Sequence, residues 1–305
     1  MIQVYNENIR KHTLPKDFYT ACITDPPYGI SFMGESWDKE VPSADIWQKI
    51  LVSLRPGAYL LAFSSTKLQH RMGTEIEKSG FVIRDSLMWG YGGGMPKGYN
   101  ISKAIEAYKK YGKTSPVYLK KIEQAGNGKS YKLAGKNNGI LGEKKIFDRK
   151  EYTPQDADAI NYDGYSTCLV PCFESIIMAQ KPIEGNLASN ILKYNTGCLN
   201  MNNIQNGQIP KNLIVEQETG LDKYLYCGKP KKKDKYNNHP TVKPTELMEY
   251  LLTIVSNPKD NYILDPFAGS GTTGVAAKNL GINCDLVEID AKFVDIIKER
   301  LNAPS

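Results

Sequence analysis

The stretch Asp265–Gly274, with the sequence DPFAGSGTTG, constrains the fold of this chain more than any other. The apolar residues of 262–264 precede it as a short buried strand would, and a helical segment follows it and ends at Gly281. Its glycines, Gly269, Gly271 and Gly274, form a G-x-G-x-x-G pattern between strand and helix. In this context the glycines allow close approach of a ligand, and the helix N-terminus offers it free N–H groups.

A second strand is predicted directly after this unit, over 283–289. It carries Glu288, about 20 residues beyond the first glycine, where a carboxylate can bind both hydroxyls of a ribose. The two features together predict a site for an adenosine-containing cofactor.

The position of the glycine loop dictates where the rest of the sheet must come from. Only one helix fits after Asp290, whereas a doubly wound sheet needs several more parallel strands. The upstream sequence supplies them. Strands are predicted at 2–5, 18–24, 58–63, 81–91 and 173–180, the last pairing with 81–91, and helices at 44–54, 66–79, 101–111 and 245–255.

Composition excludes several classes of protein. The 305 residues are 41% hydrophobic, and no apolar run approaches the roughly 20 residues needed to span a bilayer. The N-terminus lacks the pattern of a signal peptide, and the six scattered cysteines lack the spacing of a zinc site. We therefore expect a cytoplasmic protein with reduced thiols, no metal and no membrane partner.

The net charge of +6 is unevenly distributed. Residues 97–150 hold 14 Lys/Arg against 4 Asp/Glu, and a second lysine cluster lies at 229–235. The region from Gly90 to about residue 165 is rich in glycine, lysine and tyrosine and has little regular pattern. A long irregular stretch inside a compact domain is usually functional, and this charge favours a polyanion. We interpret it as an inserted recognition region between two strands, with a nucleic acid as the expected polyanion.

The sequence Asp25-Pro26-Pro27-Tyr28 follows a predicted buried strand, at the sheet edge where α/β proteins bind ligands. Pro26 and Pro27 fix the turn and carry no N–H. The Asp25 carboxylate and the Pro26 carbonyl can therefore accept both hydrogens of an exocyclic amine and leave its lone pair free for attack. Tyr28 offers a flat face on which a base flipped out of the helix could stack.

At this point the chain resembles the exocyclic-amino DNA methyltransferases that use S-adenosylmethionine. Residues 25–28 resemble motif IV of that family, 239–244 resemble motif X, 265–273 resemble motif I and 287–290 resemble motif II. Their order, with the recognition region after motif IV, is similar to the β group, and 89–97 and 174–197 look like segments of phage-borne members. The resemblance implies a Rossmann-like, doubly wound, mostly parallel seven-stranded α/β sheet with an inserted target-recognition region. It also implies adenine N6 as the methylated position. At the position of Asp25, adenine-N6 enzymes of the family usually have aspartate, whereas cytosine-N4 enzymes have serine.

The same resemblance implies the site residues. Catalysis is assigned to Asp25, Pro26, Pro27 and Tyr28. Contacts to the cofactor are assigned to the glycine loop and its neighbours. Many members of the family have an aspartate that contacts the cofactor's adenine, and the residue that matches it here is Asn8. These cofactor residues are Asn8, Thr241, Lys243, Asp265, Phe267, Gly269, Ser270, Gly271, Thr272, Thr273 and Glu288.

We therefore expect a site-specific adenine-N6 DNA methyltransferase of a restriction-modification type. Its predicted domains are 1–96 (catalytic half), 97–165 (recognition insertion) and 166–305 (cofactor half), and a homodimer is compatible with them. The sequence leaves open a cytosine-N4 enzyme, a methyltransferase of RNA or of a protein amide, and a DNA-binding protein with an inactive site. An NAD-dependent oxidoreductase would suit the glycine loop and Glu288 but has no use for residues 25–28 or the basic insertion.

Overall fold

The computed structural model describes residues 1–30, 38–91, 98–125, 130–134, 146–150, 152–202, 209–215, 225–226 and 242–303. Thr241 and the lysine cluster at 229–235, both singled out above, lie outside these residues. The chain divides into two compact units, Met1–Gly92 with Cys172–Ser305, and Gly93–Pro171. The predicted insertion at 97–165 falls within the second unit, and its role in recognition stays a prediction.

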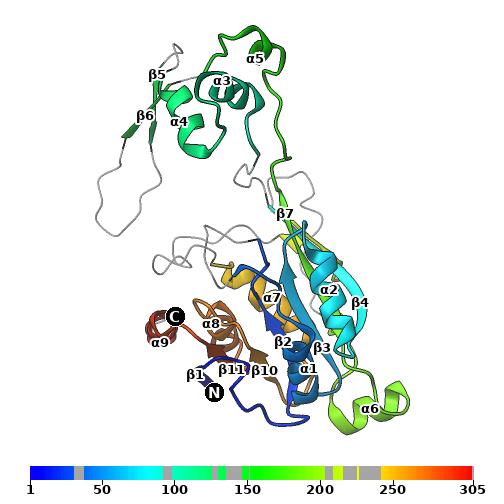
Figure 1. The fold of residues 1–305 in the computed structure, drawn as a ribbon. Coiled ribbons are helices and arrows are strands. Elements are labelled where there is room, and N and C mark those ends of the chain that lie inside the picture. Colours follow the sequence, from blue (N-terminus) through cyan, green and yellow to red (C-terminus); the bar gives the residue numbers. More distant parts are fainter. Residues whose placement is uncertain are drawn as a thin grey trace. The chain divides into compact units, whose positions relative to one another are not determined.

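The first unit contains all strands of the large sheet and six of the helices that the structure describes (Figure 1). Its strands are β1 (Ile2–Asn6), β2 (Tyr19–Thr24), β3 (Leu54–Ser64), β4 (Val82–Gly90), β7 (Phe173–Gln180), β8 (Leu213–Val215), β9 (Leu225–Tyr226), β10 (Tyr262–Asp265) and β11 (Asn283–Glu288). Its helices are α1 (Ala44–Ser53), α2 (Gln69–Lys78), α6 (Leu187–Tyr194), α7 (Thr245–Val255), α8 (Thr272–Asn279) and α9 (Ala291–Asn302).

The strand order is β1-β11-β10-β2-β3-β7-β4-β8-β9 among the described residues. Neighbouring strands are parallel except at β7, which is antiparallel to both β3 and β4. The doubly wound, mostly parallel α/β fold predicted from the sequence is confirmed, including the pairing of 173–180 with 81–91. The seven expected strands run from β1 to β4 in this order, and the short strands β8 and β9 extend the sheet beyond them.

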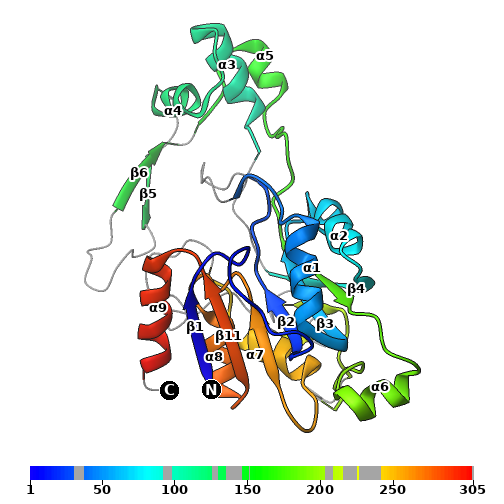
Figure 2. The same cartoon turned by 60° about the horizontal axis from the view of Figure 1, so that its bottom comes forward.

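Successive side chains of the central strands point to opposite faces of the sheet and pack into two separate hydrophobic layers. On β3, Leu61 and Phe63 join the layer under α7 and α8, whereas Leu60 and Ala62 join the layer under α1 and α2. Helices therefore cover both faces of the sheet (Figure 2). Because the inner strands are buried on both faces, their sequences are continuous apolar runs.

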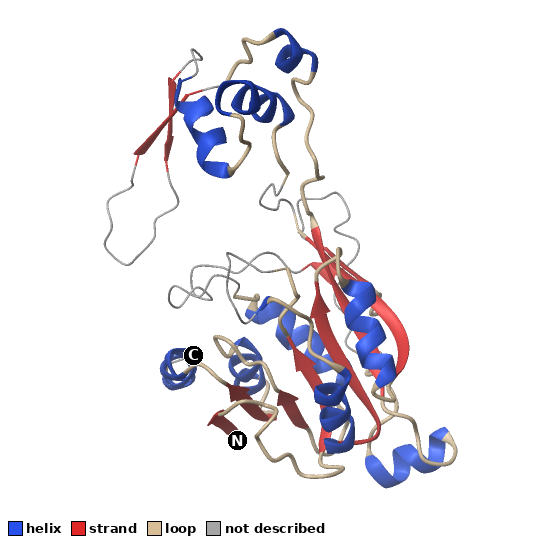
Figure 3. Cartoon of the chain, viewed as in Figure 1, coloured by secondary structure: helices blue, strands red, loops and turns tan. Residues whose placement is uncertain are grey.

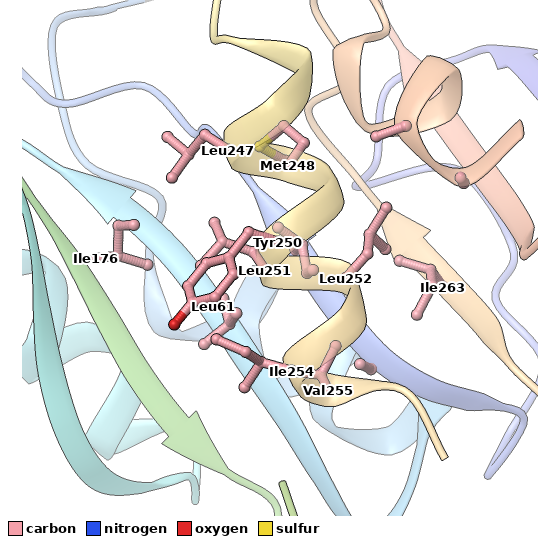
Figure 4. Close-up of a cluster of buried hydrophobic side chains, with 14 of the residues drawn as sticks. Leu61, Ile176, Leu247, Met248, Tyr250, Leu251, Leu252, Ile254, Val255 and Ile263 are labelled. Atoms are coloured by element: carbon pink, nitrogen blue, oxygen red, sulfur yellow. The ribbon is translucent and has the colours of Figure 1, made fainter. Parts of the chain in front are cut away.

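Helix α7 is buried more completely than its sequence suggested. The spacing of Leu247, Leu251, Ile254 and Val255 predicts one apolar face, but Met248, Tyr250 and Leu252 are buried as well. Figure 4 shows these side chains spread around the helix, toward Leu61 and Ile176 on one side and Ile263 on another. The helix packs against both the sheet and α8, so it needs apolar residues on more than one face.

The second unit is a small mixed α/β structure (Figure 3). Helix α3 (Ile101–Tyr111) packs against α4 (Pro116–Ala125) and α5 (Ala157–Asn161), and β5 (Ser130–Ala134) pairs with β6 (Ile146–Lys150) in an antiparallel hairpin. The side chain of Asn100 caps α3 by accepting a hydrogen bond from the Lys103 N–H. Regular structure thus occurs where the sequence predicted only a short helical piece at 101–111. None of the helices in the described part of the chain has the length and hydropathy of a membrane span.

Candidate active site

The two halves of the chain meet where β2 and β10 lie side by side. These strands are parallel neighbours, so residues 25–28 and the glycine loop both leave the sheet at the carboxyl ends of the strands. The Thr24 hydroxyl donates a hydrogen bond of 2.7 Å to Oδ1 of Asp265 and links the last residue of one strand to the last residue of the other. The adjacency predicted from the sequence is therefore present in the fold.

The glycine loop turns sharply because two of its glycines have left-handed backbones, with φ of 52° at Gly269 and 77° at Gly271. Helix α8 begins immediately after, at Thr272. From α9, the buried guanidinium of Arg300 donates to the Ser270 carbonyl at 2.6 Å and also reaches the hydroxyls of Ser270 and Thr272. The last helix of the described chain thus holds the loop in place.

Asp265 is buried at the base of the loop, and its carboxylate is fully engaged there. Oδ1 accepts from Thr24 and from the Phe267 N–H, and Oδ2 accepts from the Thr273 hydroxyl at 2.5 Å. Burial raises the pKa of Asp265 to about 6, although the hydrogen bonds from Thr273, Thr24 and Phe267 act in the opposite direction. The carboxylate shapes the loop, and any contact that it makes to a cofactor stays a prediction.

Glu288 ends β11 beside the loop. Its Oε2 accepts from the Gly269 N–H at 2.7 Å and its Oε1 from the Asp290 N–H at 2.8 Å, while burial raises its pKa. Asn8 follows the neighbouring strand β1, where the Glu7 N–H donates to the Glu288 carbonyl. The structure therefore brings Asn8, Glu288 and the glycine loop to one edge of the sheet.

The Asp25 carboxylate has a donor on each oxygen. The Tyr28 hydroxyl lies 2.7 Å from Oδ1, and the Lys243 ammonium lies 2.6 Å from Oδ2. The backbone N–H groups of Tyr28 and Gly29 both donate to Oδ1 of the buried Asp38, at 2.6 and 2.9 Å. Asp38 thus fixes the turn through two of its backbone N–H groups.

Lys243 is the buried cation of the site, with 8% of its side chain exposed. It also lies 3.2 Å from Oε2 of Glu174 and packs over the Phe63 ring, 4.9 Å from the centroid. Burial alone would lower the pKa of Lys243, but the charges of Asp25 and Glu174 outweigh it and the pKa is raised. The ammonium therefore stays protonated and links the turn at 25–28 to the segment leading into α7.

Three residues of this arrangement were missed by sequence reasoning. Glu174 is the second residue of β7, and the antiparallel direction of that strand brings its first residues close to the turn at 25–28. Arg300 could have been noticed in the sequence, because it is a charged residue in the otherwise apolar stripe of the last helix. Asp38 could not have been, since nothing in the sequence ties it to the turn ten residues earlier.

The arrangement provides hydrogen-bond acceptors and a fixed positive charge beside a loop suited to a nucleotide-like cofactor. Of the predicted site residues, those at 25–28, Lys243, the glycine loop, Glu288 and Asn8 lie along the ends of β1, β11, β10 and β2. Thr241 cannot be placed with them because it lies outside the described residues.

Comparison with known proteins agrees with this geometry. A family model described as DNA methylase matches residues 19–299. The type II methyltransferase M.HindIII of Haemophilus influenzae is 27% identical over 81% of this chain, and the DNA adenine methyltransferase YhdJ of Escherichia coli is 42% identical over 24% of it. The alignments cover 60% and 24% of those two proteins, so the chain spans less than two thirds of either.

The fold has relatives among solved structures as well. The crystal structure of the M1.HpyAVI–SAM complex superimposes with a TM-score of 0.53 at 21% identity, covering 98% of this chain and all of the other. At this identity the likeness concerns the fold, and it extends over nearly the whole chain.

Proposed function

This chain belongs to the N6/N4 family of DNA methylases, and from that premise we propose that it transfers a methyl group from S-adenosylmethionine to adenine N6 of a base flipped out of double-stranded DNA. The observation that carries the proposal is the hydrogen bond between Thr24 and Asp265. It joins the turn suited to holding an amine to the loop suited to holding the methyl donor. Neither motif alone would indicate methyl transfer to a base.

The chemistry requires orientation more than activation, because the sulfonium already activates the methyl group. Asp25 and the Pro26 carbonyl accept the two hydrogens of the amine and direct its lone pair at the methyl carbon. Tyr28 stacks on the base, Pro27 keeps the turn rigid, and Lys243 holds the Asp25 carboxylate in place through an ion pair.

The cofactor would rest on the glycine loop. Gly269 and Gly271 would allow its close approach, Asp265 and Phe267 would line its methionine and ribose, and Glu288 would accept from the ribose hydroxyls. Asn8 occupies the position where many members of the family have an aspartate that contacts the adenine. Ser270, Thr272 and Thr273 would shape the loop around the cofactor, and the resemblance assigns Thr241 and Lys243 to its methionine end. The motif order, with the Asp-Pro-Pro-Tyr turn before the recognition region, is that of the β group.

Adenine is favoured over cytosine by the aspartate at the head of the turn. The relative YhdJ is named a DNA adenine methyltransferase, and its match, although short, is close. The family includes N4 as well as N6 enzymes, so cytosine N4 is the alternative target.

The inserted unit is proposed to bind the duplex through its lysines and tyrosines. On α3 and α4, the ammonium of Lys121 lies 5.7 Å from the Tyr111 ring and 5.1 Å from the Tyr118 ring. Together with the excess of 14 Lys/Arg over 4 Asp/Glu in 97–150, such clusters suit contacts to phosphates.

The test is methyl transfer to DNA that lacks methylation. Purified protein and S-adenosylmethionine are incubated with such DNA, and long-read sequencing sensitive to methylation reports the base, the position and the recognition sequence together. We expect N6-methyladenine at one short sequence. N4-methylcytosine would select the alternative, and absence of any methylated base would contradict the proposal.

Replacing Asp25 by alanine separates catalysis from cofactor binding. Asp25→Ala should reduce methyl transfer by about 10²-fold or more, because the amine loses its charged acceptor. Affinity for S-adenosylhomocysteine, measured by calorimetry, should change little. Near-normal turnover in this variant would refute the assigned mechanism, and tight binding of NAD in place of S-adenosylhomocysteine would point to an oxidoreductase.

A further inference from the structure

Glu174 lies within reach of the catalytic turn although it belongs to a distant part of the sequence. Its Oε2 lies 3.0 Å from the Tyr28 hydroxyl and 3.2 Å from the Lys243 ammonium. The pairing of Ser64 with Ser175 places Glu174 at the carboxyl end of β3, next to the turn. A carboxylate that is three-quarters buried at this edge, between a hydroxyl and an ammonium, calls for an explanation.

The hydroxyl of Tyr28 has two carboxylates in range but only one hydrogen. It lies 2.7 Å from Asp25 Oδ1 and 3.0 Å from Glu174 Oε2, so it can donate to one of them at a time. If either carboxylate takes up a proton, that acid can donate to the Tyr28 oxygen while Tyr28 donates to the other. The three groups thus form a chain along which one proton can pass from Asp25 to Glu174.

Methyl transfer to an amine creates a need for such a path. The amine lone pair forms the new N–C bond, the C–S bond breaks, and its electron pair stays on sulfur, which becomes a neutral thioether. The positive charge moves to the amine nitrogen, which must lose one hydrogen as a proton. Asp25 is the acceptor nearest to that hydrogen, yet the bound base would cover it, so the proton needs a further route.

We propose that Glu174 is the terminal acceptor of a proton relay through Asp25 and Tyr28. The N–H bond of the methylated amine breaks as Asp25 gains the proton; Asp25 then passes a proton to the Tyr28 oxygen while Tyr28 passes its own to Glu174. Asp25 returns to its ionised form, Tyr28 stays neutral, and Glu174 releases the proton to solvent through the quarter of its side chain that is exposed. This inference rests on the proposed methyl transfer.

The other charged and titratable groups near Glu174 fit this role. Lys243 faces it from the segment before α7 but is already protonated, and its raised pKa prevents it from accepting the proton. Tyr91, which follows β4, also lies in the field of Glu174, and burial raises its pKa to about 12, so it stays neutral. Asp38 also contacts the turn, but it accepts from the backbone N–H groups of Tyr28 and Gly29. Among the described residues, Glu174 is thus the carboxylate other than Asp25 that is recorded within hydrogen-bond distance of the Tyr28 hydroxyl.

The experiment compares single-turnover methyl transfer by the wild type, Glu174→Gln, Tyr28→Phe and the double variant between about pH 6 and pH 9. Glutamine keeps the size of Glu174 but cannot take up the proton, and phenylalanine keeps the ring of Tyr28 without its hydroxyl. Glu77→Gln, at an exposed glutamate of α2, is the matched control. Calorimetry with S-adenosylhomocysteine reports cofactor binding for each variant.

We expect the wild-type rate to be flat over this range and that of Glu174→Gln to be about 10-fold lower or more at the acid end. The rate of Glu174→Gln should rise with pH, because the proton must then leave directly to hydroxide. Cofactor affinity should be unchanged. Tyr28→Phe should acquire the same pH dependence, and adding Glu174→Gln to it should cost less than about 2-fold, since the relay is already broken.

Two results would overturn the relay. One is a wild-type rate and pH profile in Glu174→Gln. The other is a loss that is equal at every pH and equally large in the Tyr28→Phe background, which would mean that Glu174 only anchors Lys243. Failure of the proposed function looks different, because the wild type itself would then transfer no methyl group to DNA, and the relay would fall with it.

Discussion

At the scale of single residues, Asp265 shows how burial and hydrogen bonding compete for one carboxylate. Three donors favour its ionised form, yet burial is the stronger influence and its pKa rises from the ordinary 3.8 to about 6. The folded state therefore binds this proton more tightly than the unfolded state does. The stability that the neutral acid contributes is fully present below about pH 3.8 and is lost as the pH rises through about 6.

The substitution Asp265→Asn allows the effect of this pKa on the unfolding free energy to be measured. Asparagine is neutral at every pH, so the difference in unfolding free energy between variant and wild type should shift in favour of the variant as the pH rises from about 4 to 7.5. The shift should be roughly 3 kcal/mol at most, the equivalent of the rise in pKa. Urea denaturation of the unliganded protein across this range is the test, and a difference independent of pH would contradict it.

At the scale of elements, α9 stabilises the glycine loop through Arg300. Its guanidinium satisfies the Ser270 carbonyl and two hydroxyls in a buried setting, where an unpaired acceptor is costly. Arg300→Met keeps the apolar stem and removes these bonds. We expect an affinity for S-adenosylhomocysteine about 10-fold lower by calorimetry, while Lys298→Met, at an exposed position of the same helix, should bind as the wild type does.

Strand β11 packs closely against helix α8 at Gly274. A Cβ at this position would lie 2.5 Å from Cδ1 of the fully buried Leu286. Gly274→Ala should therefore lower the unfolding free energy by about 1–3 kcal/mol. Because the backbone of Gly274 is helical, the cause is space alone, and Leu286→Val should recover part of the loss in the double variant. Denaturation of the two single variants and the double variant tests this, and strictly additive losses would contradict it.

The elements also show which parts of the fold were within reach of the sequence. The strands before residue 25 and residue 265 were predicted because each is a short apolar run that ends in a distinctive turn. Their adjacency was expected because the strand before the glycine loop needs parallel neighbours, and the upstream sequence supplies them. The placement of Glu174 could not be predicted, since it depends on β7 lying between β3 and β4, a long-range arrangement that no local pattern records. The same holds for Asp38, which acts through tertiary contact alone.

At the scale of the whole molecule, the large sheet is complete without the inserted unit. β4 and β7 are antiparallel neighbours with Gly90 opposite Phe173, and the Tyr91 N–H donates to the Cys172 carbonyl at 2.8 Å. The chain therefore leaves the first unit after Tyr91 and re-enters it at Cys172 at the distance between paired strands of a hairpin. Every contact described for the catalytic turn and the glycine loop lies within that first unit.

Replacing 93–171 by an Asn-Gly turn should consequently leave a folded protein, because such a turn closes an antiparallel pair with the correct twist. We expect this variant to bind S-adenosylhomocysteine within a few-fold of the full chain and to lose methyl transfer to DNA. Its residual DNA affinity should also depend less steeply on salt, since the deleted segment contains the basic window at 97–150 and each phosphate contact contributes to that slope. Methylation at the original sequence by the shortened protein would instead locate target recognition in the first unit, because the cofactor loop and the catalytic turn would then suffice to choose the base.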